Sequence, residues 1–155
     1  MSVSPAPLAP AERAAETVDL VAREVAYRGH FQVGRYRFRH GLYQGGSSAV
    51  LQREVFERGH AAAVLPYDPL RDEVVLIRQF RAGAQVAGRH AWPWEVVAGV
   101  LQPGETAEEL ARREAIEEAG LRISDTIRLH DCILSPGGCS ETCVVLLGRT
   151  DTTNA

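Results

Sequence analysis

Apolar and polar residues alternate through the first half of the chain with a period of two, which is typical of β-strands with one buried face. Strands are predicted over residues 17–28, 31–39 and 49–57. Two shorter apolar runs, 61–65 and 74–79, are joined by a segment whose Asp-Pro and Arg-Asp pairs favour a turn. This half of the chain is therefore predicted to consist mainly of β-structure.

The second half combines strands with one helix. Residues 82–94 are rich in Gly and Ala and are predicted to form a loop, whereas 95–101 has the pattern of a strand. Further strands are predicted over 127–134 and 142–148, on either side of a turn-rich segment. Strands, a helix and more strands in this order favour an α+β domain with mixed sheets packed around helices.

The helix is predicted from local signals at both of its ends. Thr106 stands three residues before Glu109, which is the spacing of a capping box. Gly120 is expected to end the helix, because glycine readily takes the left-handed conformation that closes a helix C-terminus.

Composition narrows the possible chemistry. The chain has 155 residues and 17 cationic side chains, all of them arginine. Without lysine, the protein can form neither a Schiff base nor a phosphate-binding loop of the Gly-Lys-Ser/Thr type. Anions can still be bound by arginine, by backbone amides or through a metal ion. A chain of this length is expected to form one domain with a core of ordinary size.

The sequence shows no pattern of export or membrane insertion. Residues 1–16 lack a basic region followed by an apolar stretch, and we expect a loose tail that leads into a short helix or strand. No apolar run approaches the roughly 20 residues of a membrane-spanning helix. Cys132, Cys139 and Cys143 are odd in number and form no CxxC pair, which indicates reduced thiols and a cytoplasmic protein.

Charge is small in total, −3, but unevenly distributed. Residues 105–118 hold six Glu against two Arg, whereas residues 23–58 hold seven Arg against three Glu. Binding of a metal ion by the first region and of an anion by the second would explain this asymmetry. Nucleic-acid binding by the basic region is the alternative, but a pI near 6.0 argues against a polyanion partner.

The glutamates of the predicted helix point to a metal site. Glu114 and Glu118 are four residues apart on one helix face, and Glu117 flanks them, so their charges repel one another. A hard divalent cation such as Mg²⁺ would compensate this repulsion. The alternative is a solvated face with ion pairs inside the helix, from Arg113 to Glu109 or Glu117 and from Arg112 to Glu108.

A longer motif contains these glutamates. Counted from Gly99, the sequence reads Gly-x5-Glu-x7-Arg-Glu-x-x-Glu-Glu-x-Gly and ends at Gly120. It resembles the Nudix box, with all seven fixed residues in agreement and a small Ala115 at the first aliphatic position. The resemblance implies a Nudix fold and hydrolysis of a nucleoside diphosphate linked to another group, using Mg²⁺ or Mn²⁺. It also assigns roles, with metal ligation by Glu114, Glu118 and the Ala98 carbonyl, catalysis supported by Glu117, and orientation of the acidic side chains by Arg113.

Beyond the box, the chain is similar to bacterial ADP-ribose pyrophosphatases. Pro136, sixteen residues past Gly120, is their distinguishing mark, and stretches such as RYRFRH (35–40) and REVFERGHAA (53–62) match as well. This resemblance implies cleavage of ADP-ribose to AMP and ribose 5-phosphate. It also implies a homodimer with extra antiparallel N-terminal strands, residues 1–57, that swap between subunits, followed by a catalytic domain over 58–155.

The same resemblance implies a set of substrate contacts. His30, which replaces the usual aromatic residue, would bind the adenosine end from the other subunit together with Phe31, Arg53 and Glu54. The remaining contacts, to the diphosphate and the two riboses, would come from Arg58, Arg81, Val100, Ser135, Pro136, Gly137 and Glu141.

The general base is not assigned by these motifs. Members of the family carry it in a loop that would lie beyond Ala155, so we expect either a chain cut short at its C-terminus or a substitute role for Glu141. Two alternatives to ADP-ribose cleavage therefore stay open. One is a pyrophosphatase for another nucleoside diphosphate sugar, and the other is a Nudix-fold module that binds a nucleotide without cleaving it. Neither nucleic acid nor a membrane is expected as a partner.

Overall fold

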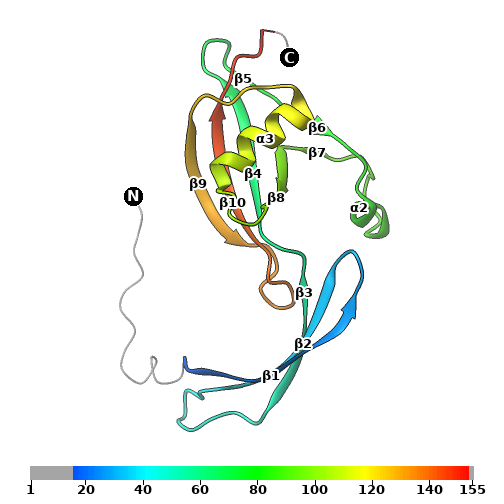
Figure 1. Ribbon diagram of the computed structural model, residues 1–155, viewed down its shortest axis with the longest axis vertical. Coiled ribbons are helices and arrows are strands. Elements are labelled where there is room, and N and C mark those ends of the chain that lie inside the picture. The colour runs from blue at the N-terminus through cyan, green and yellow to red at the C-terminus, as the bar shows by residue number, and fades with distance from the viewer. Residues whose placement is uncertain (1–15, 154–155) are drawn as a thin grey trace. The chain divides into compact units, whose positions relative to one another are not determined.

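The computed structural model describes residues 16–153, so nearly all of the expected N-terminal tail falls outside it. The described chain forms two compact units (Figure 1). The first holds residues 16–58 together with 137–139, and the second holds 59–136 and 140–153.

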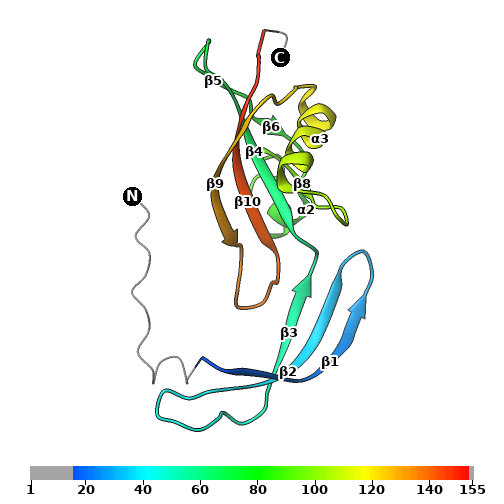
Figure 2. The same cartoon turned by 60° about the vertical axis from the view of Figure 1, so that its left-hand side comes forward.

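The first unit is built on a three-stranded antiparallel sheet. Its strands are β1 (Val18–Arg28), β2 (Gln32–His40) and β3 (Leu51–Glu57), in the order β1-β2-β3 (Figure 2). All three predicted N-terminal strands are thus confirmed. On β2, Arg35 forms ion pairs with Glu24 and Glu54 on the two neighbouring strands, at 3.1 and 3.3 Å.

A polar cluster covers the other face of β2. Tyr36 donates its hydroxyl hydrogen to Glu57, whose second oxygen accepts from Gln32 at 2.6 Å and from Arg23 at 2.8 Å. These donors, led by Tyr36, lower the pKa of Glu57. Gly34 leaves room for the cluster, because a β-carbon there would lie 2.6 Å from Glu57 Oε1. Glu57 therefore ties all three strands of this sheet together.

The second unit contains a mixed five-stranded sheet. Four of its strands are hydrogen-bonded in the order β5-β4-β10-β9, and the fifth, β8, pairs with β4. Strands β4 and β10 are parallel to each other, and their remaining neighbours are antiparallel. The strands are β4 (Ala61–Asp68), β5 (Glu73–Val74), β8 (Val97–Val100), β9 (Thr126–Ile133) and β10 (Thr142–Arg149).

Helix α3 (Ala107–Ala119) packs on one face of this sheet, against β4, β8 and β10 (Figure 1). Leu110 and Ala115 of the helix are fully buried in one cluster with Val64 and Leu146 of the sheet. Burial of a leucine of this kind stabilises a fold by about 1.5–3 kcal/mol. Ala107 and Ala111 of α3 are buried in the same cluster as Ala115, and such small side chains let the helix approach the sheet closely. The predicted α+β arrangement is confirmed.

Both predicted ends of the helix are confirmed. The Thr106 hydroxyl accepts from the Glu109 N–H at 3.2 Å, and Glu109 in return accepts from the Thr106 N–H at 2.8 Å. Gly120 ends the helix in the left-handed conformation, with φ at 67°. Two backbone amides at this end of the helix, those of Thr106 and Glu109, are thus satisfied by its own side chains.

Three short segments differ from the sequence-based expectation. The run 74–79, predicted as one strand, is divided between β5 and β6 (Ile77–Arg78), because β5 pairs with β4 and β6 pairs with β7 (Trp94–Glu95). Likewise β7 and β8 replace the single strand predicted over 95–101. The predicted loop 82–94 contains a short helix, α2 (Ala82–Val86).

The cysteines of the described chain are free thiols. Cys132 and Cys143 are direct partners in the β9–β10 register, and burial raises the pKa of Cys143. Within residues 16–153, no helix has both the length and the apolar character needed to cross a membrane.

Candidate functional site

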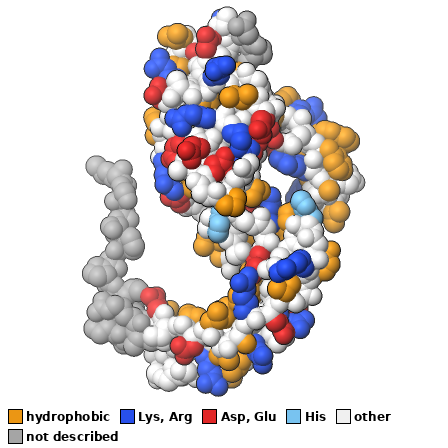
Figure 3. Space-filling model, viewed as in Figure 1, with side chains coloured by type: hydrophobic (Ala, Val, Ile, Leu, Met, Phe, Trp, Pro, Cys, Tyr) orange, Lys and Arg blue, Asp and Glu red, His pale blue; other side chains and the backbone are white. Residues whose placement is uncertain are grey.

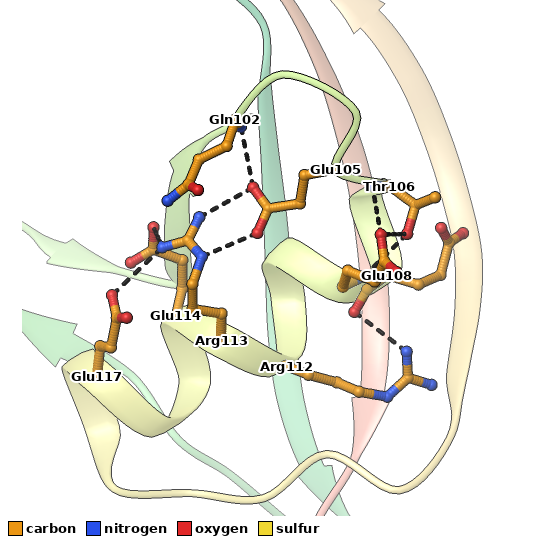
Figure 4. Close-up of polar contacts among 9 residues, drawn as sticks. Gln102, Glu105, Thr106, Glu108, Arg112, Arg113, Glu114 and Glu117 are labelled. Atoms are coloured by element: carbon orange, nitrogen blue, oxygen red, sulfur yellow. Dashed lines mark hydrogen bonds and ion pairs between the residues drawn. The ribbon is translucent and has the colours of Figure 1, made fainter.

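The candidate site lies on α3, where charged side chains gather on the exposed face of the helix (Figure 3). Glu114, Glu117 and Glu118 all lie in its C-terminal half. Arg113 and Glu105 lie beside Glu114 and Glu117 (Figure 4). A helix places residues four apart on one face, which brings Glu117 to Arg113, whereas Glu105 reaches Arg113 from the turn before the helix.

Arg113 is the centre of the ion-pair network. Its Nε and Nη2 donate to the two oxygens of Glu105 at 2.8 and 3.0 Å, and its Nη1 donates to Glu114 at 2.7 Å and Glu117 at 3.3 Å (Figure 4). Glu105, then Glu114, raise the pKa of Arg113, and Arg113 lowers the pKa of Glu105. The planar guanidinium thus binds Glu105 through two parallel hydrogen bonds and still contacts Glu114 and Glu117, whereas an ammonium lacks this two-pronged geometry.

The structure contains only some of the ion pairs that the alternative hypothesis, a solvated acidic helix face, predicts. Arg113 does contact Glu117, but Glu109 is taken up by the capping box with Thr106. Arg112 donates to the backbone carbonyl of Glu108 at 3.2 Å rather than to its carboxylate. The ion-pair network therefore does not consist only of pairs four residues apart in the helix, because it includes Glu105 in the turn before the helix.

Gly99 makes room for Glu114. A β-carbon on Gly99 would lie 2.8 Å from Glu114 Cγ and closer still to its carboxylate. Such approaches are sterically forbidden, so this stretch of β8 must lack a side chain for Glu114 to lie against its backbone. The glycine that opens the box is thus explained by close contact with the helix glutamate.

Glu118 has a different environment. Gln79, directly after β6, donates its amide to Glu118 Oε1 at 2.9 Å, and the Ala98 N–H donates to Oε2 at 3.3 Å. Sequence reasoning did not find Gln79, because 39 residues separate it from its partner and no local pattern marks it. Ala98, expected to offer its carbonyl to a metal, contacts Glu118 through its amide.

The donor set fits a divalent cation. Carboxylates are the hard oxygen ligands that Mg²⁺ favours, and Glu114, Glu117 and Glu118 supply them from one stretch of α3. Among residues 16–153, no three His, Cys, Asp or Glu side chains already converge as a finished metal site. The reason is that Glu114 and Glu117 are turned toward Arg113, while Glu118 is held by Gln79. A cation would compete with Arg113 for Glu114.

In the first unit, three predicted substrate contacts lie together. The rings of His30 and Phe31 meet edge to face with centroids 4.5 Å apart, and the Arg58 guanidinium lies 5.7 Å from the Phe31 ring centre. Phe56 supports Phe31 from the side, at 5.1 Å. These residues form an aromatic and cationic surface of the kind that can stack on a planar ring.

Arg53 and Glu54 point to opposite faces of β3, because they are neighbours on a strand. Glu54 pairs with Arg35 at 3.3 Å, whereas Arg53 donates to the Gln52 carbonyl at 2.8 Å. The two residues therefore do not act from one surface within this sheet.

In the second unit, Arg81 donates through Nε to both oxygens of Glu95, at 3.1 and 2.9 Å. Val100 is 42% exposed at the end of β8. Glu95 was not anticipated from the sequence, since it lies fourteen residues from Arg81.

The turn between β9 and β10 carries the remaining predicted contacts. Ser135 and Pro136 are exposed, and Gly137 belongs to the segment that associates with the first unit. Glu141, at the end of the turn, is only 4% exposed. Its neighbour Thr142 is anchored by a 2.8 Å hydrogen bond between its hydroxyl and His60 Nδ1.

Comparison with known proteins gives close relatives. The chain is 50% identical over 138 residues to an ADP-ribose pyrophosphatase of Escherichia coli K12, covering 89% of this chain and 66% of the relative. It is 35% identical over 143 residues to an ADP-ribose pyrophosphatase of Haemophilus influenzae, covering 90% and 66%. This chain thus spans just under two thirds of the length of these relatives.

Two further matches are more distant. A GDP-mannose pyrophosphatase of Klebsiella pneumoniae is 40% identical over 97 residues, which cover 62% of this chain and 48% of the relative. A crystal structure of an ADP compounds hydrolase superposes with a TM-score of 0.64 at 22% identity, covering 86% of this chain and 68% of that one. The second match shows a shared fold.

The family assignment rests on a match across most of the chain. The model of the NUDIX domain matches residues 49–154, which include the box from Gly99 to Gly120 and all of its helix glutamates. With the fold and the relatives described above, this match shows that the chain belongs to the Nudix family.

Proposed function

We propose that this chain hydrolyses ADP-ribose to AMP and ribose 5-phosphate with the help of Mg²⁺ or Mn²⁺. One water molecule is added across the diphosphate bridge, so that each product keeps one phosphate. The observation that carries the proposal is the arrangement of Glu114, Glu117 and Glu118 around Arg113 and Gly99. The 50% identity to an ADP-ribose pyrophosphatase over 89% of the chain supports the choice of substrate.

Glu114, Glu118 and the Ala98 carbonyl are the proposed metal ligands. When bound, the cation would neutralise diphosphate charge and lower the pKa of an attacking water. Arg113 holds Glu114 and Glu117 in place through the contacts described above. Glu117, 57% exposed, is the most accessible of these carboxylates and is proposed to interact with water near the diphosphate.

Substrate recognition is proposed to use residues of both subunits of a dimer. His30, Phe31 and Arg58 would bind the adenosine end and the phosphate next to it, since a stacked ring and a guanidinium suit a nucleotide. Arg81 and Val100 would flank the diphosphate. The other contacts we propose are Arg53, Glu54, Ser135, Pro136, Gly137 and Glu141.

A homodimer is proposed as the working form, with residues 1–57 as the unit that crosses to the partner and 58–155 as the catalytic unit. Support comes from β1, an edge strand whose Val18, Leu20 and Tyr27 are 64%, 56% and 62% exposed. Exposed apolar residues on an unpaired strand edge favour association. The cytoplasm is proposed as its location, in keeping with the free thiols of the described chain.

The test is to incubate the protein with ADP-ribose and Mg²⁺ and to follow AMP by chromatography. We expect AMP and ribose 5-phosphate in equal amounts, loss of both with Glu118→Gln, and loss of both on chelation of the metal. Release of AMP that persists undiminished in Glu118→Gln would contradict the metal assignment.

A second candidate substrate class is another nucleoside diphosphate sugar, which the 40% identity to a GDP-mannose pyrophosphatase favours. A comparison of kcat/KM for ADP-ribose and GDP-mannose decides between the two. If neither is cleaved but ADP-ribose binds with a measurable Kd, the protein is a nucleotide-binding module, and the hydrolase proposal fails for this chain.

A further inference from the structure

We propose that Gln79 is a positioning residue for Glu118, an inference that rests on the metal role proposed for this glutamate. Gln79 follows β6, and its amide nitrogen lies 2.9 Å from Glu118 Oε1. The Ala98 N–H holds the other oxygen at 3.3 Å. Two separate segments thus fix both the position and the plane of one carboxylate.

The partners of Glu118 are chemically unlike those of its neighbours. Glu114 and Glu117 pair with the Arg113 guanidinium, whereas the hydrogen bonds that the described chain gives Glu118 come from two neutral groups. A neutral donor orients a carboxylate without cancelling its charge. Gln79 therefore orients Glu118 without placing a competing positive charge beside it, as Arg113 does for Glu114.

The hydrogen bonds also leave room for a ligand. Each carboxylate oxygen can accept about two hydrogen bonds or metal contacts, and within residues 16–153 each oxygen of Glu118 has one hydrogen-bond donor. Metal-binding side chains generally depend on such partners, and losing one weakens metal binding by roughly 10- to 100-fold. An arginine at position 79 would instead compete with the metal, so an amide is the better donor here.

The competing explanation of the Gln79–Glu118 hydrogen bond is that it only ties β6 to α3 and stabilises the fold. The segment around Gln79 has other supports, because β6 pairs with β7 and Arg78 lies over the Trp94 ring at 5.0 Å. Removal of one amide should therefore leave the fold intact. The two explanations differ in outcome: a tether affects melting temperature, whereas a positioning residue affects metal affinity.

The experiment uses Gln79→Met, which keeps the length of the side chain and removes the donor. Binding of Mn²⁺ alone is measured by calorimetry, and the melting temperature is measured without metal. We expect Mn²⁺ binding to weaken about 10- to 100-fold with an unchanged metal-free melting temperature. The control is Gln85→Ala, an exposed glutamine of α2, which should bind Mn²⁺ as the unaltered chain does.

A double variant separates this proposal from the metal assignment. If Gln79 acts through Glu118, then Gln79→Met combined with Glu118→Gln binds Mn²⁺ no more weakly than Glu118→Gln alone. Unchanged Mn²⁺ affinity in Gln79→Met, or a lower melting temperature without loss of affinity, would overturn the role of Gln79 alone. Unchanged affinity in Glu118→Gln, or no Mn²⁺ binding by the unaltered chain, would overturn the metal assignment and this proposal with it.

Discussion

Gly99 on β8 and Glu114 on α3 are in such close contact that a β-carbon on Gly99 would lie 2.8 Å from Glu114 Cγ. Gly99 is not among the glycines with positive φ, so a special backbone conformation is not the reason for its presence. The reason is space, since the strand backbone and the glutamate side chain occupy adjoining volumes. The first residue of the box, Gly99, thus gives the Glu114 side chain, fifteen residues later, the space that it occupies.

Gly99→Ala is expected to displace Glu114 while the fold remains, because the glutamate can rotate outward. Misplacement of a reacting group by about 1 Å can cost roughly 100-fold in rate, so kcat/KM for ADP-ribose should fall by about that factor. The measurement is AMP release at saturating Mg²⁺. Gly83→Ala is the matched control, since nothing lies within 4 Å of a β-carbon there. Full activity of Gly99→Ala would contradict the steric argument.

Arg113→Lys tests the ion-pair network. Lysine keeps the positive charge but cannot reproduce the two parallel hydrogen bonds from Arg113 Nε and Nη2 to Glu105, at 2.8 and 3.0 Å. We expect a loss of about 10-fold or more in kcat/KM, because groups that orient metal ligands typically contribute that much. Arg112→Lys, whose parent bonds a backbone carbonyl, should leave kcat/KM unchanged. Unchanged kcat/KM in Arg113→Lys would show that the positive charge alone is sufficient at this position.

Local features of the site could be predicted from the sequence. The capping box of Thr106 and Glu109 depends on residues three apart, and the carboxylate spacing of Glu114 and Glu118 depends on one helix. Such signals lie within a few residues of each other, so a single sequence contains them in full. The helix, its ends and the strands around it followed from this kind of pattern.

Contacts between distant segments could not be predicted in this way. The Gln79–Glu118 hydrogen bond depends on how β6 and α3 pack, and the register of either segment alone gives no sign of it. The division of 74–79 into β5 and β6 has the same origin, because each short strand follows a different partner. Tertiary pairing outweighed local pattern at both places.

Asp68 gives a prediction for stability against pH. This carboxylate, 2% exposed at the end of β4, has its pKa lowered to about 2, chiefly by the N–H of Thr152 and further by that of Leu70. Because the folded pKa lies below the ordinary value of 3.8, ionised Asp68 stabilises the fold above pH 3.8. This contribution is lost as the pH falls from 3.8 toward about 2.

Asp68→Asn should therefore be less stable than the unaltered chain at pH 7, with the difference narrowing as the pH falls below 3.8. Urea unfolding at a series of pH values measures the free energy of unfolding of Asp68→Asn and of the unaltered chain. Asp131→Asn, which alters a carboxylate with 62% of its side chain exposed, is the control and should change stability little. A gap between Asp68→Asn and the unaltered chain that stays constant from pH 7 to 3 would refute the argument.

Leu20→Glu tests the proposed dimer. A charge on the exposed edge strand β1 should oppose pairing of two such strands, because each dimer would then bury two carboxylates. We expect light scattering to give twice the 16.9 kDa chain mass for the unaltered protein and the single mass for the variant. Leu70→Glu, at a leucine that is 90% exposed in the second unit, is the control. A variant that remains dimeric would place the interface elsewhere.

Thr106→Ala tests how far the cap of α3 supports the site. Without the hydroxyl, the Glu109 N–H loses its 3.2 Å acceptor, and the free energy of unfolding should fall by about 1 kcal/mol. Thr106→Ser keeps the acceptor and should retain most of the stability.

Because Glu114 and Glu118 lie in the C-terminal half of α3, both variants should bind Mn²⁺ as the unaltered chain does well below the melting temperature. Urea unfolding and Mn²⁺ calorimetry on the same samples separate the two effects. Weaker Mn²⁺ binding in the folded alanine variant would mean that fraying of the first turn reaches the glutamates, and that α3 is less rigid than its buried Leu110 and Ala115 indicate.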